Sequence, residues 1–125
     1  MRTEMMAQTD EAWPTELRVT DEGRVLAVTF EEGTHLSLAA EYLRVESPSA
    51  EVQGHSAAER KTVGGKRAVR ITAATPIGNY AVKLRFDDGH DSGLFTWRYL
   101  HELGTEHEAK WEAYLAALAA RGLSR

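Results

Sequence analysis

The residues with the clearest chemical potential lie in one acidic turn, which holds Asp87, Asp88, His90 and Asp91. Carboxylates coordinate cations, and a carboxylate beside a histidine raises the pKa of the imidazole. The turn is therefore a candidate cation site or a candidate recognition element built on a charged histidine. Acidic hairpin turns also serve solubility alone, so simple solvation competes with both functions.

Motifs for catalysis are missing from the rest of the sequence. The chain has no cysteine, which excludes a disulfide framework, a thiolate nucleophile and a thiolate metal site. It has neither a Gly-x-Ser-x-Gly elbow nor a His-Glu-x-x-His zinc helix. The iron triad of oxygenases usually begins with an acid two positions after a histidine, and none of the histidines has one: His35, His55, His90, His101 and His107. We therefore expect no enzyme, and an undetected small enzyme stays an alternative.

Alternating apolar residues predict the strands that position the turn. Strands are expected at residues 17–19, 25–30, 34–38, 69–73, 80–86 and 92–95, with Thr75 and Pro76 ending or bending the fourth. Short helices are expected at residues 39–46 and from residue 96. The predicted fold is α+β, in two layers, with a mostly antiparallel sheet of five to six strands packed against a C-terminal helix. His35 falls on the polar face of its strand and is expected to be solvated.

The last helix is predicted for residues 106–121. Thr105 suits its N-cap and Glu108 completes a capping box, while Gly122 suits the position after its end. The apolar face of this helix, which we expect to dock on the sheet, carries Trp111, Tyr114, Leu115 and Leu118.

The totals describe a mildly acidic chain of 125 residues with a formal net charge of −4. This size suits one domain, expected at residues 16–125 after a flexible tail at residues 1–15. Nucleic acid is an unlikely partner at this charge. We expect no membrane span and a cytoplasmic location, because no long apolar run or signal-peptide core is present. The basic loop at residues 60–70 suits an acidic partner or phosphate, but a solvated loop is favoured.

Two segments together carry a family resemblance: LRVESPSAEVQGH at residues 43–55 and GNYAVKLRFDDGHDSGLFTWRYL at residues 78–100. The chain resembles a small bacterial family of unknown function that is similar to the N-terminal domain of gamma-butyrobetaine hydroxylase. The resemblance covers most of residues 16–103 and implies an α+β domain.

In the hydroxylase, this domain holds a structural zinc through a Cys-x-Cys-x-x-Cys run and a distant histidine. By the resemblance, the cysteine positions fall at Ser47, Ser49 and Val52, and the histidine position at His90. Hydroxyls and a valine cannot replace thiolates on zinc. We therefore expect no zinc and no other cofactor, and the oxygenase activity does not carry over because the oxygenase barrel is absent.

The resulting hypothesis is a non-catalytic binding or accessory domain, with a protein partner or small ligand recognised through the turn at residues 87–91 and adjoining loops. A similar domain fused to Mrp-type iron–sulfur carrier ATPases implies an association with iron or iron–sulfur enzymes. The alternative is a metal-binding domain that uses His90 with His55 or Glu51. The ring of His90 is expected to bond the backbone of the turn at residues 47–51, helped by Ser47 and Ser49, in preference to facing outward beside Asp88.

Overall fold

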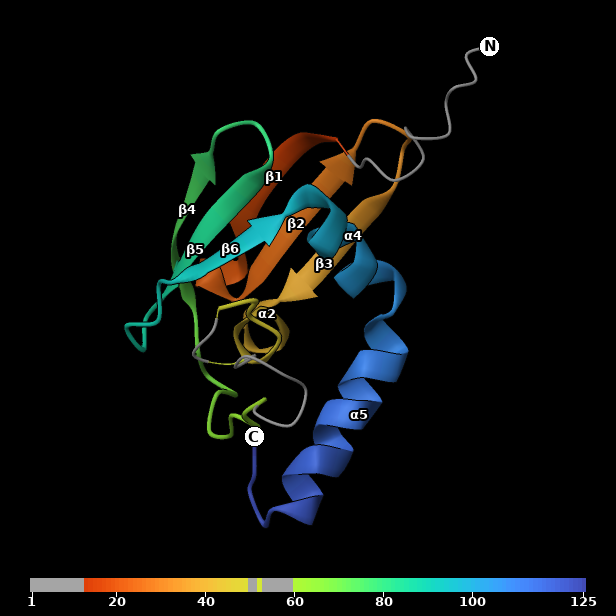
Figure 1. Ribbon diagram of the computed structural model, residues 1–125. Helices are drawn as coiled ribbons and strands as arrows, with labels where there is room; N and C mark the ends of the chain where they lie inside the picture. Colours follow the sequence, from red (N-terminus) through yellow and green to blue (C-terminus); the bar gives the residue numbers. More distant parts are fainter. Residues whose placement is uncertain (1–12, 50–51, 53–59) are drawn as a thin grey trace.

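The first half of the chain forms a three-stranded antiparallel sheet in the order β1-β2-β3. The computed structural model describes residues 13–49, 52 and 60–125 (Figure 1). Its strands are β1 (Pro14–Thr20), β2 (Val25–Phe30) and β3 (His35–Ala39), with a 3-10 turn η1 (Asp21–Gly23) after β1. The antiparallel strands predicted at residues 17–19, 25–30 and 34–38 are confirmed. β1 begins inside the predicted tail, because the Glu31 amide donates to the Trp13 carbonyl at 2.8 Å and the strand pairs from Pro14 onward.

A second three-stranded antiparallel sheet follows, in the order β4-β5-β6. Its strands are β4 (Ile71–Ile77), β5 (Ala81–Phe86) and β6 (Gly93–Thr96). The prediction of five to six strands in one sheet is therefore wrong, since the described strands divide equally between two sheets. β4 also continues through Pro76, where the sequence predicts an end or a bend. Pro76 is tolerated because β4 lies at a sheet edge, where one side of the strand needs no amide donor.

The two sheets share one hydrophobic core, which α2 (Ala40–Val45) and α4 (Trp97–Thr105) close. Figure 1 shows α2 at the end of the sheets and α4 following directly from β6. The fully buried residues of this core come from both sheets, α2 and α4: Leu26, Val28, Phe30, Leu43, Val82, Leu84, Phe86, Phe95, Leu100 and Leu103. The hydroxyl of Tyr42 donates to the Leu103 carbonyl at 2.7 Å and ties α2 to α4.

The final helix α5 (His107–Ala120) packs beside α2 and the segment around Val63, in a small cluster that Trp111 links to the main core. Trp111 is only half-buried and meets the Tyr42 ring edge-on at 6.1 Å between centroids. The helix thus lies mainly beside α2 (Figure 1), whereas the sequence predicted docking on the sheet. Leu115, predicted to face inward, is 38% exposed.

The start of α5 also differs from the prediction. Thr105 ends α4 and its hydroxyl donates back to the Glu102 carbonyl at 3.3 Å, while Glu106 occupies the N-cap of α5 without a side-chain cap. The capping box is lost because α4 runs on through Gly104, whose backbone lies against the Leu36 side chain. At the other end, Gly122 has φ +67°, as predicted for the residue after the helix. Within the described residues, no helix is long and apolar enough to cross a membrane.

Candidate functional site

The connection after α2 meets the β5–β6 hairpin in a cluster that we call the polar corner, formed by Ser47, Ser49, Asp88, His90 and Ser92. Three of these side chains are buried, with 0% of Ser47, 6% of Ser49 and 7% of His90 exposed. The hairpin reverses tightly, because Gly89 has φ +92° and the Phe86 amide donates to the His90 carbonyl at 2.9 Å. This reversal carries the His90 ring inward.

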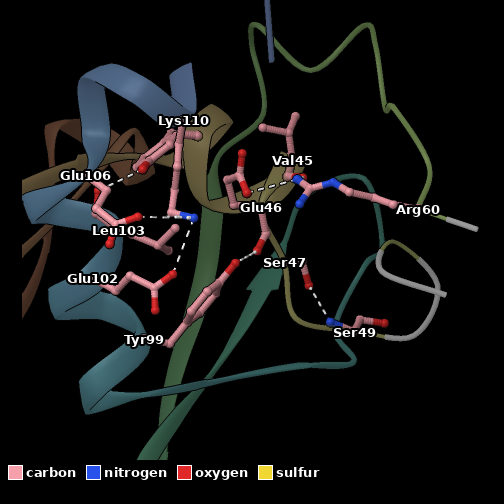
Figure 2. Close-up of polar contacts among 11 residues, drawn as sticks. Val45, Glu46, Ser47, Ser49, Arg60, Tyr99, Glu102, Leu103, Glu106 and Lys110 are labelled. Carbon is pink, nitrogen blue, oxygen red and sulfur yellow. Dashed lines mark hydrogen bonds and ion pairs between the residues drawn. The ribbon is translucent and has the colours of Figure 1, made fainter. Parts of the chain in front are cut away.

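Hydrogen bonds join the two segments of the polar corner. His90 Nε2 lies 3.0 Å from Ser47 Oγ. The same oxygen accepts from the Ser49 amide at 3.3 Å (Figure 2). Ser49 Oγ lies 2.7 Å from Ser92 Oγ. The His90 ring also rests against Phe86, with 6.1 Å between centroids. The ring therefore bonds a side-chain hydroxyl of the turn, where the sequence suggested its backbone, and it does not face outward.

Gly93, the first residue of β6, makes the close approach of these segments possible. A Cβ atom at this position would lie 2.4 Å from Ser47 Oγ and 3.5 Å from Pro48 Cδ. Such a contact is far shorter than any that packed atoms tolerate. Glycine is thus required here for space, so that the connection can lie flat on the start of the strand.

Asp88 is bound by two cations at the rim of the polar corner. Its carboxylate lies 2.8 Å from Arg44 Nε and 2.6 Å from Lys66 Nζ, and it accepts the His90 amide at 3.0 Å. Burial alone would raise the pKa of Asp88, but the hydrogen bonds from Lys66, the His90 amide and Arg44 hold it well below its usual range. Asp88 is therefore a permanent anion at neutral pH and no proton donor.

The remaining predicted residues lie in different surroundings. Asp87 accepts the Arg70 amide at 3.1 Å, whereas Asp91 is exposed and makes no hydrogen bond or ion pair with another described residue. Val52 is 2% exposed, and its amide donates to the Ser49 carbonyl at 2.9 Å. His55 and Glu51 lie outside the described residues. Among those described, no group of three histidines or carboxylates is placed to hold a metal.

A second polar site, which the sequence did not reveal, surrounds Glu46 at the end of α2. Its carboxylate is 5% exposed and lies 2.9 Å from Arg60 Nη2, while its carbonyl accepts the Tyr99 hydroxyl at 2.6 Å (Figure 2). Burial and the nearby Glu46 charge raise the pKa of Tyr99 to about 12. Because Arg60 and Lys66 both bind carboxylates, the basic loop is not simply solvated.

Beside Glu46 lies a groove of about 390 Å³, which we call the α2–α5 groove. One wall comes from the end of α2 and residues 60–62, and the other from Lys110, Ala113, Ala117 and Arg121 along α5. These α5 positions recur at helical spacing, which is the only sequence signal for the groove. Its opposite wall depends on how α5 packs, which the sequence does not reveal.

Comparisons with known proteins place the chain among small domains of unknown function. Residues 17–101 match a family model described as gamma-butyrobetaine hydroxylase-like, N-terminal. Two solution NMR structures are each 46% identical to the chain. The first match covers 91% of this chain and 90% of the solved chain, with a TM-score of 0.78. The second covers 97% of this chain and 90% of the solved chain, with a TM-score of 0.80. A crystal structure of a protein of unknown function from Acidithiobacillus ferrooxidans, of the DUF971 family, is 40% identical and covers 73% of this chain and 91% of its own with a TM-score of 0.61. No curated protein matches the chain.

Proposed function

The chain belongs to the gamma-butyrobetaine hydroxylase-like N-terminal family, and on that premise we propose that it is a non-catalytic accessory domain that binds a protein partner or a small ligand. One observation carries this proposal. The reactive groups of the polar corner are engaged in contacts within the protein. His90 is hydrogen-bonded to Ser47, and Asp88 is ion-paired with Arg44 and Lys66. A general acid or base must reach a proton of the substrate, and these groups are buried or ion-paired.

The polar corner, in this proposal, replaces a zinc bridge by hydrogen bonds. The positions that the resemblance assigns to zinc ligands lie close together. Ser47 contacts both His90 and Ser49, and the Val52 amide donates to the Ser49 carbonyl. Hydroxyls donate and accept hydrogen bonds, so Ser47 can join His90 and the Ser49 amide at once. A thiolate set would instead need metal to hold the two segments together.

Elemental analysis tests the zinc-free corner. Protein purified without an affinity tag should carry no stoichiometric zinc, and a chelator should leave its melting temperature unchanged. One zinc per chain, together with a lower melting temperature after chelation, would favour the metal-binding alternative. His90 with His55 and Glu51 would then be the first ligands to substitute.

A pull-down with turn variants tests the binding function. Asp91 is the exposed, unpaired carboxylate of the turn among the described residues, so Asp91→Asn should reduce capture of a partner without changing stability. Glu31→Gln, an exposed carboxylate in the turn between β2 and β3, is the matched control. Equal capture by wild type and Asp91→Asn would remove the turn as the recognition element.

We also propose that the partner is an iron or iron–sulfur enzyme, with the family resemblance as its support. Identification of the captured proteins tests this directly. Capture of proteins that contain no iron, in repeated experiments, would contradict it and leave the binding function itself standing.

A further inference from the structure

We propose that the α2–α5 groove binds a small polyanion that carries phosphate or carboxylate groups. This inference names a ligand class for the accessory domain and rests on the binding function proposed above. The groove has a volume of about 390 Å³, which lies within the range of about 300–1,000 Å³ typical of small-molecule sites.

The charge of the groove runs against the charge of the chain. Four cationic side chains line it: Arg60 and Lys61 from the loop, Lys110 from α5 and Arg121 directly after α5. Glu46 is the one carboxylate in the same lining. The chain as a whole carries a formal net charge of −4. A local concentration of cations in an acidic protein attracts anions to that site.

Two of these cations have no carboxylate partner among the described residues. Within the described part of the chain, no ion pair joins Lys61 or Arg121 to a carboxylate. Lys110 lies 3.3 Å from Glu102 and 3.7 Å from Glu106, whose side chains are 42% and 57% exposed. Exposed pairs of this kind contribute little, so Lys110 is able to turn toward a ligand.

The walls of the groove are held in place before any ligand arrives. The Tyr114 hydroxyl donates to the Val63 carbonyl at 2.6 Å and fixes the loop to α5. Arg60 is anchored on the 5%-exposed carboxylate of Glu46 at 2.9 Å. Between the cations, Ala113 and Ala117 leave a floor without long side chains. A preformed site loses little conformational freedom when it binds.

A titration with two anions tests the proposal. Inorganic pyrophosphate and citrate are added to the full chain at constant ionic strength, and binding is followed by calorimetry and by amide chemical shifts. Each variant is compared with wild type: Lys61→Gln/Arg121→Gln removes the two cations without a described carboxylate partner, and Lys83→Gln removes an exposed cation of β5 that lies outside the groove. The groove variant should fold with an unchanged melting temperature, because neither side chain pairs with a described carboxylate.

The proposal is supported if binding is saturable and shifts the amide signals of residues 60–62 and of α5. Binding should also be at least tenfold weaker in Lys61→Gln/Arg121→Gln and unchanged in Lys83→Gln. Binding of pyrophosphate alone would assign phosphate ligands, and binding of citrate alone would assign carboxylates. The proposal is overturned if neither anion shows saturable binding, or if the substitutions in Lys61→Gln/Arg121→Gln do not weaken binding. Partner capture in the pull-down would still stand in that case, so the two proposals fail separately.

Discussion

Replacing His90 by alanine is the sharpest test of how the polar corner is built. The side chain is 7% exposed, and its Nε2 lies 3.0 Å from Ser47 Oγ, which is fully buried. The substitution deprives the Ser47 hydroxyl of this partner and empties space beside Phe86. Loss of a buried hydrogen-bond partner costs about 1–3 kcal/mol, so the free energy of unfolding should fall by that amount.

Urea titration of the variant measures this change directly. His35→Ala is the matched control, because His35 is exposed and its ring bonds only to the Thr29 hydroxyl at 3.1 Å among described residues. Exposed substitutions usually change stability by less than about 0.5 kcal/mol. The control should therefore keep the wild-type midpoint.

A double-mutant cycle with Ser47→Ala isolates the bond itself. Groups in contact show interaction energies of about 0.5–3 kcal/mol, so the double variant should be more stable than the sum of the single losses predicts. An unfolding midpoint of His90→Ala within error of wild type would refute the structural role of the histidine. Additive losses in the cycle would show that His90 stabilises the fold by some other contact.

Three further predictions concern the surroundings of this corner. Asp88→Asn should lower the free energy of unfolding by about 1.5–3 kcal/mol at pH 7, since the hydrogen bonds to a charged group are lost. Because the pKa of Asp88 is depressed in the folded state, this difference should persist above about pH 4 and shrink as the pH falls below it. Denaturation of both proteins at several pH values measures the difference. Gly93→Ala should cost about 1–3 kcal/mol through its clash with Ser47 Oγ, and adding Ser47→Ala should recover part of the loss; a melting temperature equal to wild type would disprove the close contact. Trp111→Ala should cost about 2 kcal/mol, less than the roughly 3–5 kcal/mol of a fully buried tryptophan, because the ring is only half-buried. No change in thermal stability would contradict its contact with Tyr42.

The sequence predicts what depends on neighbours along the chain. The individual strands, the acidic turn at residues 87–91 and the end of α5 at Gly122 follow from alternation and from glycine geometry, and the structure has all of them. The division into two sheets did not follow, because alternation shows that a strand exists but not which strand it pairs with. The capping box at Thr105 failed for a related reason, since packing of Gly104 against Leu36 outweighs the local preference for a cap.

Prediction of the candidate sites divides in the same way. Ser47, Ser49 and His90 were brought together by a resemblance, and the structure places Ser47 within hydrogen-bond distance of the ring. Nothing local marks the partners of Asp88, because Arg44 is 44 residues distant along the chain. The α2–α5 groove depends wholly on the packing of α5. The residues that line it on one helix face therefore do not predict a groove until the opposite wall is known.

The two separate sheets have a consequence for how the protein folds. Each sheet is a meander in which every strand pairs with its neighbour in sequence, so all the strand pairing closes short loops and should form fast. The slow step is then the docking of the two meanders over their common core. Gly23 marks this step, because its backbone meets the Ile71 carbonyl so closely that a Cβ would lie 2.6 Å from it. A side chain at position 23 should therefore hinder the joining of the halves, and it would also strain the turn between β1 and β2, because Gly23 has φ +91°.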